Sequence, residues 1–190
     1  MSIALSVAAV SSQPAKEESL ARLAERLQAR EAGALEALIE RTQSACSRLA
    51  VSILRDPDLS RDALQEAYFV VFQRIGQLRD CGAIKSWLFR IVTHCCHDIL
   101  RRRGKEVAVE AELVAPGPDL ADGVGRQEKI RATFAQLPEI DRTALALREV
   151  CSMSYEERAE VLRVPLGTVR SRLAKARQRF IEKFKGVQND

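Results

Sequence analysis

Residues 154–177 read SYEERAEVLRVPLGTVRSRLAKAR, and this stretch contains two short helical patterns with a break between them at 163–167. Ser154 and Glu157 have the spacing of an N-terminal capping box, which marks the start of the first helix. In the second helix, apolar residues recur at steps of four, three and four and share one inward face: Val169, Leu173, Ala176 and Phe180. Two helices joined by so short a turn predict a helix-turn-helix.

The second helix of this motif is strongly basic on its remaining faces. These positions carry Arg170, Arg172, Lys175, Arg177 and Arg179. The forked arginine side chain donates two parallel hydrogen bonds, which suits phosphates and guanine edges. The alternative is the solvated basic face of an ordinary helical bundle. The turn, the capping box and the basic second helix together favour DNA binding over that alternative.

Helical patterning also fills the chain upstream of this motif, and no alternation supported by hairpin signals indicates a strand. We expect helices over 19–29, 31–54, 60–78, 87–103, 127–137, 141–150, 154–162 and 168–184. Asp58 or Ser60 is expected to cap the third of these helices, and Ser86 the fourth. The sequence therefore predicts an all-α protein.

Charge divides the chain into two helical domains. Residues 17–104 hold 14 Lys or Arg against 12 Asp or Glu, whereas residues 126–190 hold 14 against 9. Residues 105–125 hold one Lys against five acids and include Pro116-Gly117-Pro118, which predicts a flexible acidic linker. We expect a flexible arm over 1–16, one domain over 17–104 and a second over 126–186. A fully extended linker of this length spans about 70 Å, so the domains could sit far apart.

Composition and cysteine spacing indicate in which compartment of the cell the protein is expected. The chain has 190 residues, 46% of them apolar and 29% charged, as in soluble globular proteins. No stretch approaches the roughly 18–20 apolar residues that a membrane-spanning helix needs, so no membrane insertion is expected. The apolar start at 1–10 has no basic leader and is not a convincing secretory signal. Five cysteines at irregular spacing do not suggest a disulfide framework, which fits a bacterial cytoplasm.

Basic and histidine side chains form one stripe along the expected helix 87–103: Arg90, His94, His97 and Arg101. The stripe lies opposite the apolar core face of that helix. It is either an ordinary solvent-facing surface or a nucleic-acid contact. Trp87 beside these groups favours nucleic acid, because an aromatic ring can stack on an unpaired base.

The run His94-Cys95-Cys96-His97 invites a zinc interpretation. Consecutive helical residues point about 100° apart, so these four cannot surround one ion. Buried structural thiols are therefore favoured, and no metal site is expected. Cys81 falls in an expected turn, which leaves a redox role open.

The expected helix 60–78 has apolar residues on two sides. Ala63 and Ala67 can serve a core, whereas Phe69 and Phe72 form a second patch three residues apart. Such a helix is either buried on both sides or docks a partner helix.

Enzyme signatures are missing from the sequence. It contains no P-loop, dinucleotide-binding glycine pattern, nucleophile elbow or zinc-protease motif. The chain is therefore expected not to be an enzyme and to need no cofactor.

Several segments resemble those of extracytoplasmic-function (ECF) sigma factors of the sigma-70 family. DALQEAY at 62–68, SWLFRI at 86–91 and DILRR at 98–102 resemble the second conserved region, and LPE at 137–139 and GTVRSRLAKAR at 167–177 resemble the fourth. The resemblance covers about residues 19–184. The family usually has Asn at His94, an aliphatic residue at Arg158 and often Gly at Arg163. A buried Arg158 is costly unless its head reaches solvent or a carboxylate such as Glu156.

The resemblance implies that the chain gives bacterial core RNA polymerase its promoter specificity, with the two domains as sigma regions 2 and 4. Residues implied to bind the clamp helices of the largest polymerase subunit are Asp62, Gln65, Glu66, Phe69 and Phe72. Those implied beside the melted −10 strand are Asp80, Lys85, Ser86, Trp87, Arg90, His94, His97 and Arg101. Those implied to read the −35 duplex are Thr168, Arg170, Ser171, Arg172, Lys175 and Arg177.

The implied partners are core RNA polymerase, promoter DNA and, as is common in the family, an anti-sigma factor. Two other classes of function stay open. A stand-alone helix-turn-helix regulator with an N-terminal helical sensor domain would bind duplex DNA tightly without polymerase. A helical metal- or redox-responsive interaction protein would bind zinc or carry a reactive thiol.

Overall fold

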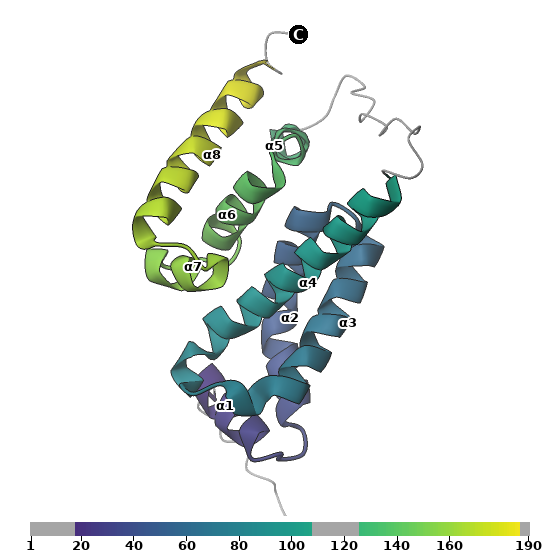
Figure 1. Ribbon diagram of the computed structural model, residues 1–190, viewed down its shortest axis with the longest axis vertical. Helices are drawn as coiled ribbons and strands as arrows, with labels where there is room; N and C mark the ends of the chain where they lie inside the picture. Colours follow the sequence, from purple (N-terminus) through teal and green to yellow (C-terminus); the bar gives the residue numbers. More distant parts are fainter. Residues whose placement is uncertain (1–17, 108–125, 187–190) are drawn as a thin grey trace, which may run out of the picture.

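The computed structural model describes residues 18–107 and 126–186 (Figure 1). Every regular element in these two ranges is helical, which confirms the all-α prediction. The α-helices are α1 (Leu20–Gln28), α2 (Ala34–Leu54), α3 (Pro57–Arg74), α4 (Ile84–Val107), α5 (Arg126–Ala135), α6 (Glu139–Glu149), α7 (Tyr155–Leu162) and α8 (Leu166–Gly186). The arm predicted over 1–16 lies outside the described residues, as does the linker predicted over 105–125, apart from its first three residues in α4.

The prediction that Asp58 or Ser60 caps α3 was wrong. Asp56 takes this role, and its Oδ1 accepts hydrogen bonds from the backbone nitrogens of Asp58 and Leu59 at 3.0 and 3.1 Å. Pro57 occupies the first helical position, where its missing N–H costs nothing. The helix therefore begins earlier than expected, and it ends earlier too, at Arg74, where a 3-10 turn over Ile75–Gln77 follows.

The prediction that Ser86 caps α4 was also wrong. Asp80 accepts a hydrogen bond of 2.8 Å from the Gly82 nitrogen and opens a 3-10 turn over Cys81–Ala83. This turn runs directly into α4 at Ile84, so Ser86 lies inside the helix and donates to the Ala83 carbonyl oxygen at 3.1 Å. The Ser86 hydroxyl therefore caps no backbone nitrogen.

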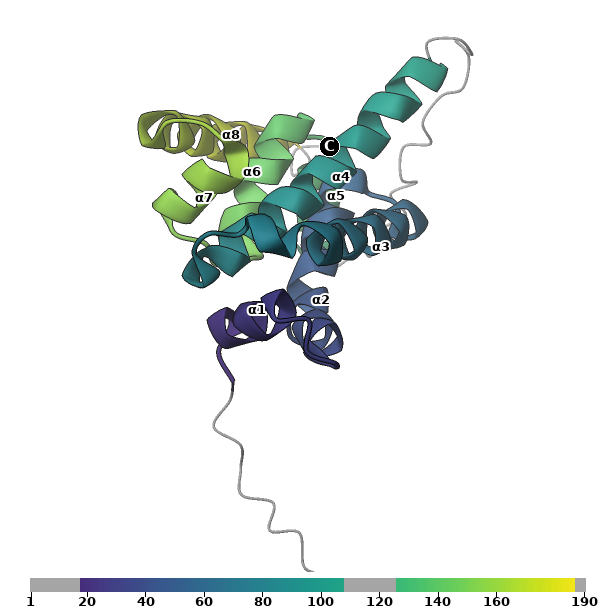
Figure 2. The ribbon, with the colours of Figure 1, turned by 60° about the horizontal axis from the view of Figure 1, so that its bottom comes forward.

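The helices α1–α4 form one bundle around a continuous apolar core. Leu38, Leu49 and Ile53 of α2 meet Ala67 of α3 and Leu88 of α4, all of them fully or almost fully buried. These residues recur at helical spacing on the inward faces, so burial of the apolar stripes drives the packing. Figure 2 shows α2, α3 and α4 in this arrangement, with α1 at one end.

The helices α5–α8 carry a smaller core of their own. Leu137 and Leu145 pack with Val169, Leu173 and Ala176, and the half-buried Phe180 lies against them. The predicted inward face of the last helix is therefore confirmed. Arg179 of α8 donates a hydrogen bond of 2.5 Å to the buried Asp141 of α6, which fixes the two helices to each other.

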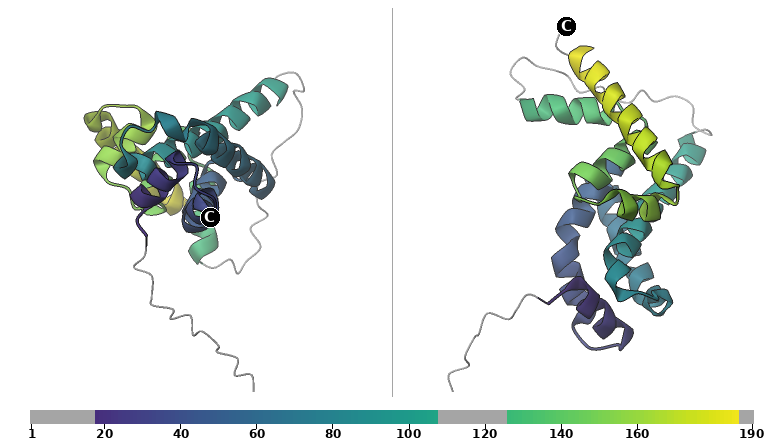
Figure 3. Two further views of the ribbon diagram at one scale, coloured as in Figure 1. Left: turned by 90° about the horizontal axis from the view of Figure 1, so that it is seen from below. Right: turned by 90° about the vertical axis from the view of Figure 1, so that its left-hand side faces the viewer.

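The two groups of helices pack against each other and do not sit far apart (Figure 3). Ala146 and Leu147 of α6 and Val161 of α7 belong to the same buried cluster as Leu49 and Ile53 of α2. The cause is that α6 is apolar on two sides, since Ala144 and Leu145 belong to one core and Ala146 and Leu147 to the other. Within the described ranges, no helix is both long and apolar enough to cross a membrane.

Candidate nucleic-acid interface

The helix-turn-helix begins with the predicted capping box. Ser154 Oγ accepts a hydrogen bond from the Glu157 nitrogen at 3.1 Å, and Glu157 Oε2 accepts one from the Ser154 nitrogen at 2.7 Å. Arg163 ends α7 in the left-handed conformation, with φ at 51°. This position often holds Gly in the family that the sequence resembles, because glycine adopts positive φ without strain. Arg163 therefore keeps the turn at a conformational cost.

The polar face of α8 points away from the core. Two of the residues predicted to read the −35 duplex are half-buried, namely Thr168 and Arg172. The other four are exposed: Arg170, Ser171, Lys175 and Arg177. Arg177 is 3.4 Å from Glu149, and the Arg170 guanidinium lies 5.7 Å from the ring centre of Tyr155. Among the described residues, no ion pair engages Arg172 or Lys175. The structure thus places all six predicted −35 residues on the surface of α8 that lies outside its buried apolar stripe.

Arg158 is buried in α7 with 3% of its surface exposed. Among the described residues it forms no ion pair with Glu156 or another carboxylate. Its Nε donates to the Ser154 carbonyl oxygen at 2.9 Å, and its guanidinium lies 4.3 Å from the ring centre of Tyr155. Burial lowers the pKa of Arg158. A carbonyl and an aromatic face therefore replace the carboxylate as its partners.

The outer face of α3 carries all five residues predicted for polymerase binding, and all five are exposed: Asp62, Gln65, Glu66, Phe69 and Phe72. The exposed fractions of Phe69 and Phe72 are 56% and 41%. The opposite face is buried through Ala63 and Ala67, so the helix has two apolar sides of which one is unpartnered. Arg30 lies 4.7 Å from the ring centre of Phe72 and covers part of that ring.

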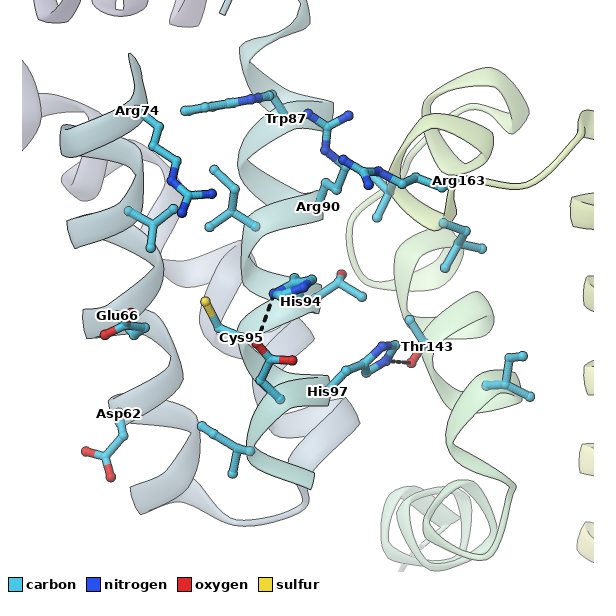
Figure 4. Close-up of a pocket in the computed structure, with 18 of the residues that line it drawn as sticks. Asp62, Glu66, Arg74, Trp87, Arg90, His94, Cys95, His97, Thr143 and Arg163 are labelled. Atoms are coloured by element: carbon cyan, nitrogen blue, oxygen red, sulfur yellow. Dashed lines mark hydrogen bonds and ion pairs between the residues drawn. The ribbon is translucent and has the colours of Figure 1, made fainter. Parts of the chain in front are cut away.

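A groove of about 970 Å³ runs between α3, α4 and the helices α6–α8. Figure 4 shows Trp87, Arg90 and His94 of α4 along it, with Arg74 on one side and Arg163 on the other. His94 Nδ1 is 3.1 Å from Asp98, and Arg101 donates to the same carboxylate at 2.5 Å. The wall of the groove on α4 therefore presents an indole ring beside the Arg90 guanidinium, a combination that suits a single strand.

Three residues predicted for the −10 strand are engaged elsewhere. Ser86 donates to Glu160 at 2.6 Å, and Lys85 Nζ lies 3.5 Å from Glu157. His97 Nε2 lies 3.2 Å from Glu139 and 3.3 Å from Thr143 Oγ1. A fourth, Asp80, caps the turn before α4. The structure therefore does not gather the eight predicted residues on one open surface. Sequence reasoning missed the acidic partners, which lie up to 74 residues away in the chain.

Four of the five cysteines are buried thiols: Cys46, Cys95, Cys96 and Cys151. Burial raises the pKa of Cys46 and Cys95 to about 11, and the pKa of Cys96 and Cys151 to about 12. Cys81 is half-buried and donates to Gln28 Oε1 at 3.5 Å. Over the described ranges, no three His, Cys, Asp or Glu side chains form a group that could hold a metal ion.

Residues 38–106 match the family described as Sigma-70 region 2, and residues 127–180 match Sigma-70, region 4. The chain is 33% identical to the RNA polymerase sigma-H factor of Pseudomonas aeruginosa, over 83% of this chain and 89% of that protein. It is 31% identical to the ECF RNA polymerase sigma-E factor of Escherichia coli, over 82% and 89%.

Two solved structures share the fold. CnrH in complex with the cytosolic domain of CnrY has a TM-score of 0.68 at 20% identity, over 89% of this chain and 99% of that chain. The sigma factor RpoE in complex with the anti-sigma factor NepR, from Bartonella quintana, has a TM-score of 0.67 at 24% identity, over 80% and 98%. The sequence matches cover both groups of helices in order, which a stand-alone regulator would not require. The chain belongs to the ECF group of the sigma-70 family of RNA polymerase sigma factors.

Proposed function

We propose that this sigma factor divides promoter-directed initiation among three helices: α3 docks on core RNA polymerase, α4 holds the unpaired −10 strand and α8 reads the −35 duplex. The observation that carries the proposal is the outer face of α8, where a basic surface stands on a buried apolar face. The division also assigns region 2 to residues 17–104, region 4 to residues 126–186 and a linker to the residues between them.

The polymerase contact is assigned to α3 because its outer face combines exposed aromatic rings with carboxylates. Phe69 offers a large apolar side chain of the kind that dominates binding energy at protein interfaces. Asp62 and Glu66 flank it and supply charges that would orient a basic partner helix. In this family the partner is the pair of clamp helices of the largest subunit.

The −10 contact is assigned to α4 and the turn before it. Opening a duplex loses base stacking, and a protein offsets that loss by holding an extruded base and by stacking another on an aromatic ring. Trp87 supplies the ring beside Arg90 and His94 (Figure 4), and these two residues, with Arg101 further along the same helix, would meet the phosphates. Asp80, Lys85, Ser86 and His97 belong to the same proposed contact, although in this structure each is bonded to another part of the chain.

The −35 contact is assigned to the first turns of α8. Arg170 and Arg172 are long enough to reach base edges, where the guanidinium pairs with guanine O6 and N7. Thr168, Ser171 and Lys175 lie on one side of the helix and Arg177 on another, and these four residues would meet phosphates and base edges. Affinity for the duplex is therefore expected to fall as salt rises.

The proposal also covers how the chain is regulated and where in the cell it acts. An anti-sigma factor that covers these surfaces would hold the chain inactive, by analogy with RpoE of Bartonella quintana, whose structure was solved in complex with an anti-sigma factor. The chain itself would catalyse no reaction and would act in the cytoplasm of a bacterium, where the polymerase is.

The test combines the full chain with sigma-free core polymerase and genomic DNA fragments. The proposal predicts a stable complex with core, retention of particular fragments only when both proteins are present, and permanganate-reactive thymines upstream of the start site. Failure to bind core under conditions where a related sigma factor binds would reject it. Tight, sequence-specific retention of duplex DNA by the chain alone would favour the stand-alone regulator.

A further inference from the structure

Two 3-10 turns follow each other between α3 and α4, and the second leads directly into α4, the helix proposed to hold the −10 strand. The Leu78 nitrogen closes the first turn on the Ile75 carbonyl oxygen at 3.0 Å. The Ala83 nitrogen closes the second turn on the Asp80 carbonyl oxygen, also at 3.0 Å. Each of these hydrogen bonds stays within one turn. What holds the two turns in register with the bundle is therefore to be found in side-chain contacts.

The side-chain amide of Gln28, the last residue of α1, contacts both turns. Its Nε2 donates a hydrogen bond of 2.6 Å to the Leu78 carbonyl oxygen and one of 3.1 Å to the Ile75 carbonyl oxygen. Its Oε1 accepts a hydrogen bond of 3.5 Å from the thiol of Cys81, the first residue of the second turn. One amide thus joins residues 47 to 53 positions further along the chain.

The hydrogen-bonding capacity of the Gln28 amide matches its three partners. The amide nitrogen carries two N–H donors, which meet two carbonyl oxygens, and the amide oxygen meets the Cys81 thiol. Partial burial and the negative charges of Glu25 and Asp80 raise the pKa of Cys81, so the thiol is protonated at neutral pH and can donate. The reverse orientation of the amide would set its oxygen against two carbonyl oxygens. The contacts therefore fix the amide in one orientation.

The helix that carries Gln28 is itself firmly packed. Leu23, Ala24 and Leu27 of α1 have exposed fractions of at most 1%. The Gln28 amide therefore connects the turns to a fixed element and not to another loop. A binding site keeps its working geometry to within about 0.5 Å only when such a supporting contact holds it. Asp80 and Trp87, on and just after the second turn, depend on that support, whereas Phe69 of α3 and Arg170 of α8 do not.

We propose that Gln28 and Cys81 are positioning residues for the −10 contact: their hydrogen bonds hold the turn before α4 where it can discriminate among unpaired bases. The inference rests on the proposed function and adds two residues, neither of which needs to touch DNA. A merely structural role of Gln28 would weaken binding to every promoter alike. A positioning role changes the ratio of affinities for a correct and an altered −10 element, and this ratio is the quantity to measure.

The first experiment compares Gln28→Met with Gln43→Met in complex with core polymerase. Methionine keeps the length of the side chain but cannot donate to the carbonyl oxygens of the turns. Gln43 lies exposed on α2 and is the matched control. The probes are a genomic fragment retained by the wild-type complex and the same fragment with its −10 bases replaced. Both fragments keep the −35 element, so the contribution of α8 cancels in the ratio of their affinities.

The wild-type complex is expected to bind the original fragment at least about tenfold more tightly than the altered one. Gln28→Met should reduce this ratio at least about threefold, and Gln43→Met should leave it unchanged. Circular dichroism of each variant checks that the helices are retained.

The second experiment needs no substitution in the chain that is tested. Methyl methanethiosulfonate converts the half-buried Cys81 thiol into a methyl disulfide, which removes its proton and adds bulk beside Gln28. The chain is treated and freed of reagent before core is added. The treatment is expected to reduce the −10 ratio at least about threefold, and dithiothreitol should restore it. Cys81→Ser, which has no thiol at this position, should keep the same ratio with and without treatment.

The outcomes separate this inference from the proposed function. An unchanged ratio in Gln28→Met, including one in which both affinities fall equally, would overturn the positioning role of Gln28. An unchanged ratio after modification of Cys81 would overturn the role of the thiol. A wild-type complex that binds both fragments equally would instead count against the proposed −10 contact itself.

Discussion

The guanidinium of Arg142 donates a hydrogen bond of 3.1 Å to the backbone carbonyl oxygen of Ile53, and so ties α6 of region 4 to the last turn of α2 in region 2. Carbonyl oxygens in the last turn of a helix have no partner within the helix, so a donor from outside is needed when they are buried. Arg142 also donates to the Leu137 carbonyl oxygen at 2.5 Å. Burial lowers its pKa, but arginine remains charged at neutral pH. The buried Arg142 guanidinium thus donates hydrogen bonds to two carbonyl oxygens, one in each half of the chain.

Arg142→Ala is expected to lower the free energy of unfolding by about 2–3 kcal/mol, because two charged hydrogen bonds are lost and the Ile53 oxygen is left unpaired. The measurement is urea denaturation of the full chain followed by circular dichroism. Arg103→Ala is the control: Arg103 is 3.7 Å from Asp56 at the surface, and its loss should cost less than about 0.5 kcal/mol. Equal losses in the two variants would contradict the buried link.

Arg158→Leu is expected to keep or raise stability, by up to about 1 kcal/mol. The buried cation loses solvation and has only a carbonyl and the Tyr155 ring as partners, whereas leucine fills the site without that loss. Arg158→Ala should instead destabilise by about 1–2 kcal/mol, because it leaves a cavity. Thermal unfolding of both variants measures this, and a leucine variant as unstable as the alanine variant would contradict the expectation.

Phe69→Ala is expected to weaken binding to core polymerase by at least tenfold, about 1.4 kcal/mol, with little change in stability. The ring is 56% exposed and therefore contributes little to the core. Val51→Ala, also exposed and apolar at 41% but on α2, is the matched control and should bind normally. Competition for core against a labelled relative measures both, and equal affinities would remove α3 from the interface.

Arg170→Ala combined with Arg172→Ala is expected to lower −35-dependent promoter binding by the holoenzyme about tenfold or more and to flatten its salt dependence. The control removes two positive charges from the far end of the same helix, with Lys183→Ala and Lys185→Ala, which should have a smaller effect. If the two double variants bind the promoter with equal affinity, α8 contributes only its positive charge and does not read the −35 element.

Thiol titration is expected to distinguish Cys81 from the other cysteines. At pH 8 a thiol with a pKa of about 11 or 12 is almost entirely protonated and unreactive, which holds for the four buried cysteines. A disulfide reagent should therefore modify one of the five thiols quickly in the native protein and all five in denaturant. Rapid reaction of two or more native thiols would show that the core opens readily.

Local features of the sequence predicted the helices and their inward faces well. Val169, Leu173 and Ala176 are buried, as their spacing predicted. The capping box predicted at Ser154 and Glu157 is also present. These features depend on residues within one or two helical turns. The predicted caps of α3 and α4 were wrong because several acidic residues and serines lie close together at these helix starts. The path of the backbone decides which of them faces the helix end.

Contacts between distant segments could not be predicted in the same way. The bond between Ser86 and Glu160 joins residues 74 apart, and nothing local marks either as a partner of the other. The two-sided apolar character of α6 was the available signal for packing between the halves, because Leu145 and Leu147 cannot both face one core. The residue types of the −10 surface were therefore predictable, but their contacts with the acidic side chains of α6 and α7 were not.

The most direct test of the account is run-off transcription with sigma-free core polymerase on upstream fragments from the same genome. Adding the full chain should yield discrete transcripts from particular fragments, and these should vanish with the Arg170→Ala and Arg172→Ala double variant while core binding persists. Absence of promoter-specific transcripts with core that a related sigma factor activates, together with failure to bind that core, would contradict the account.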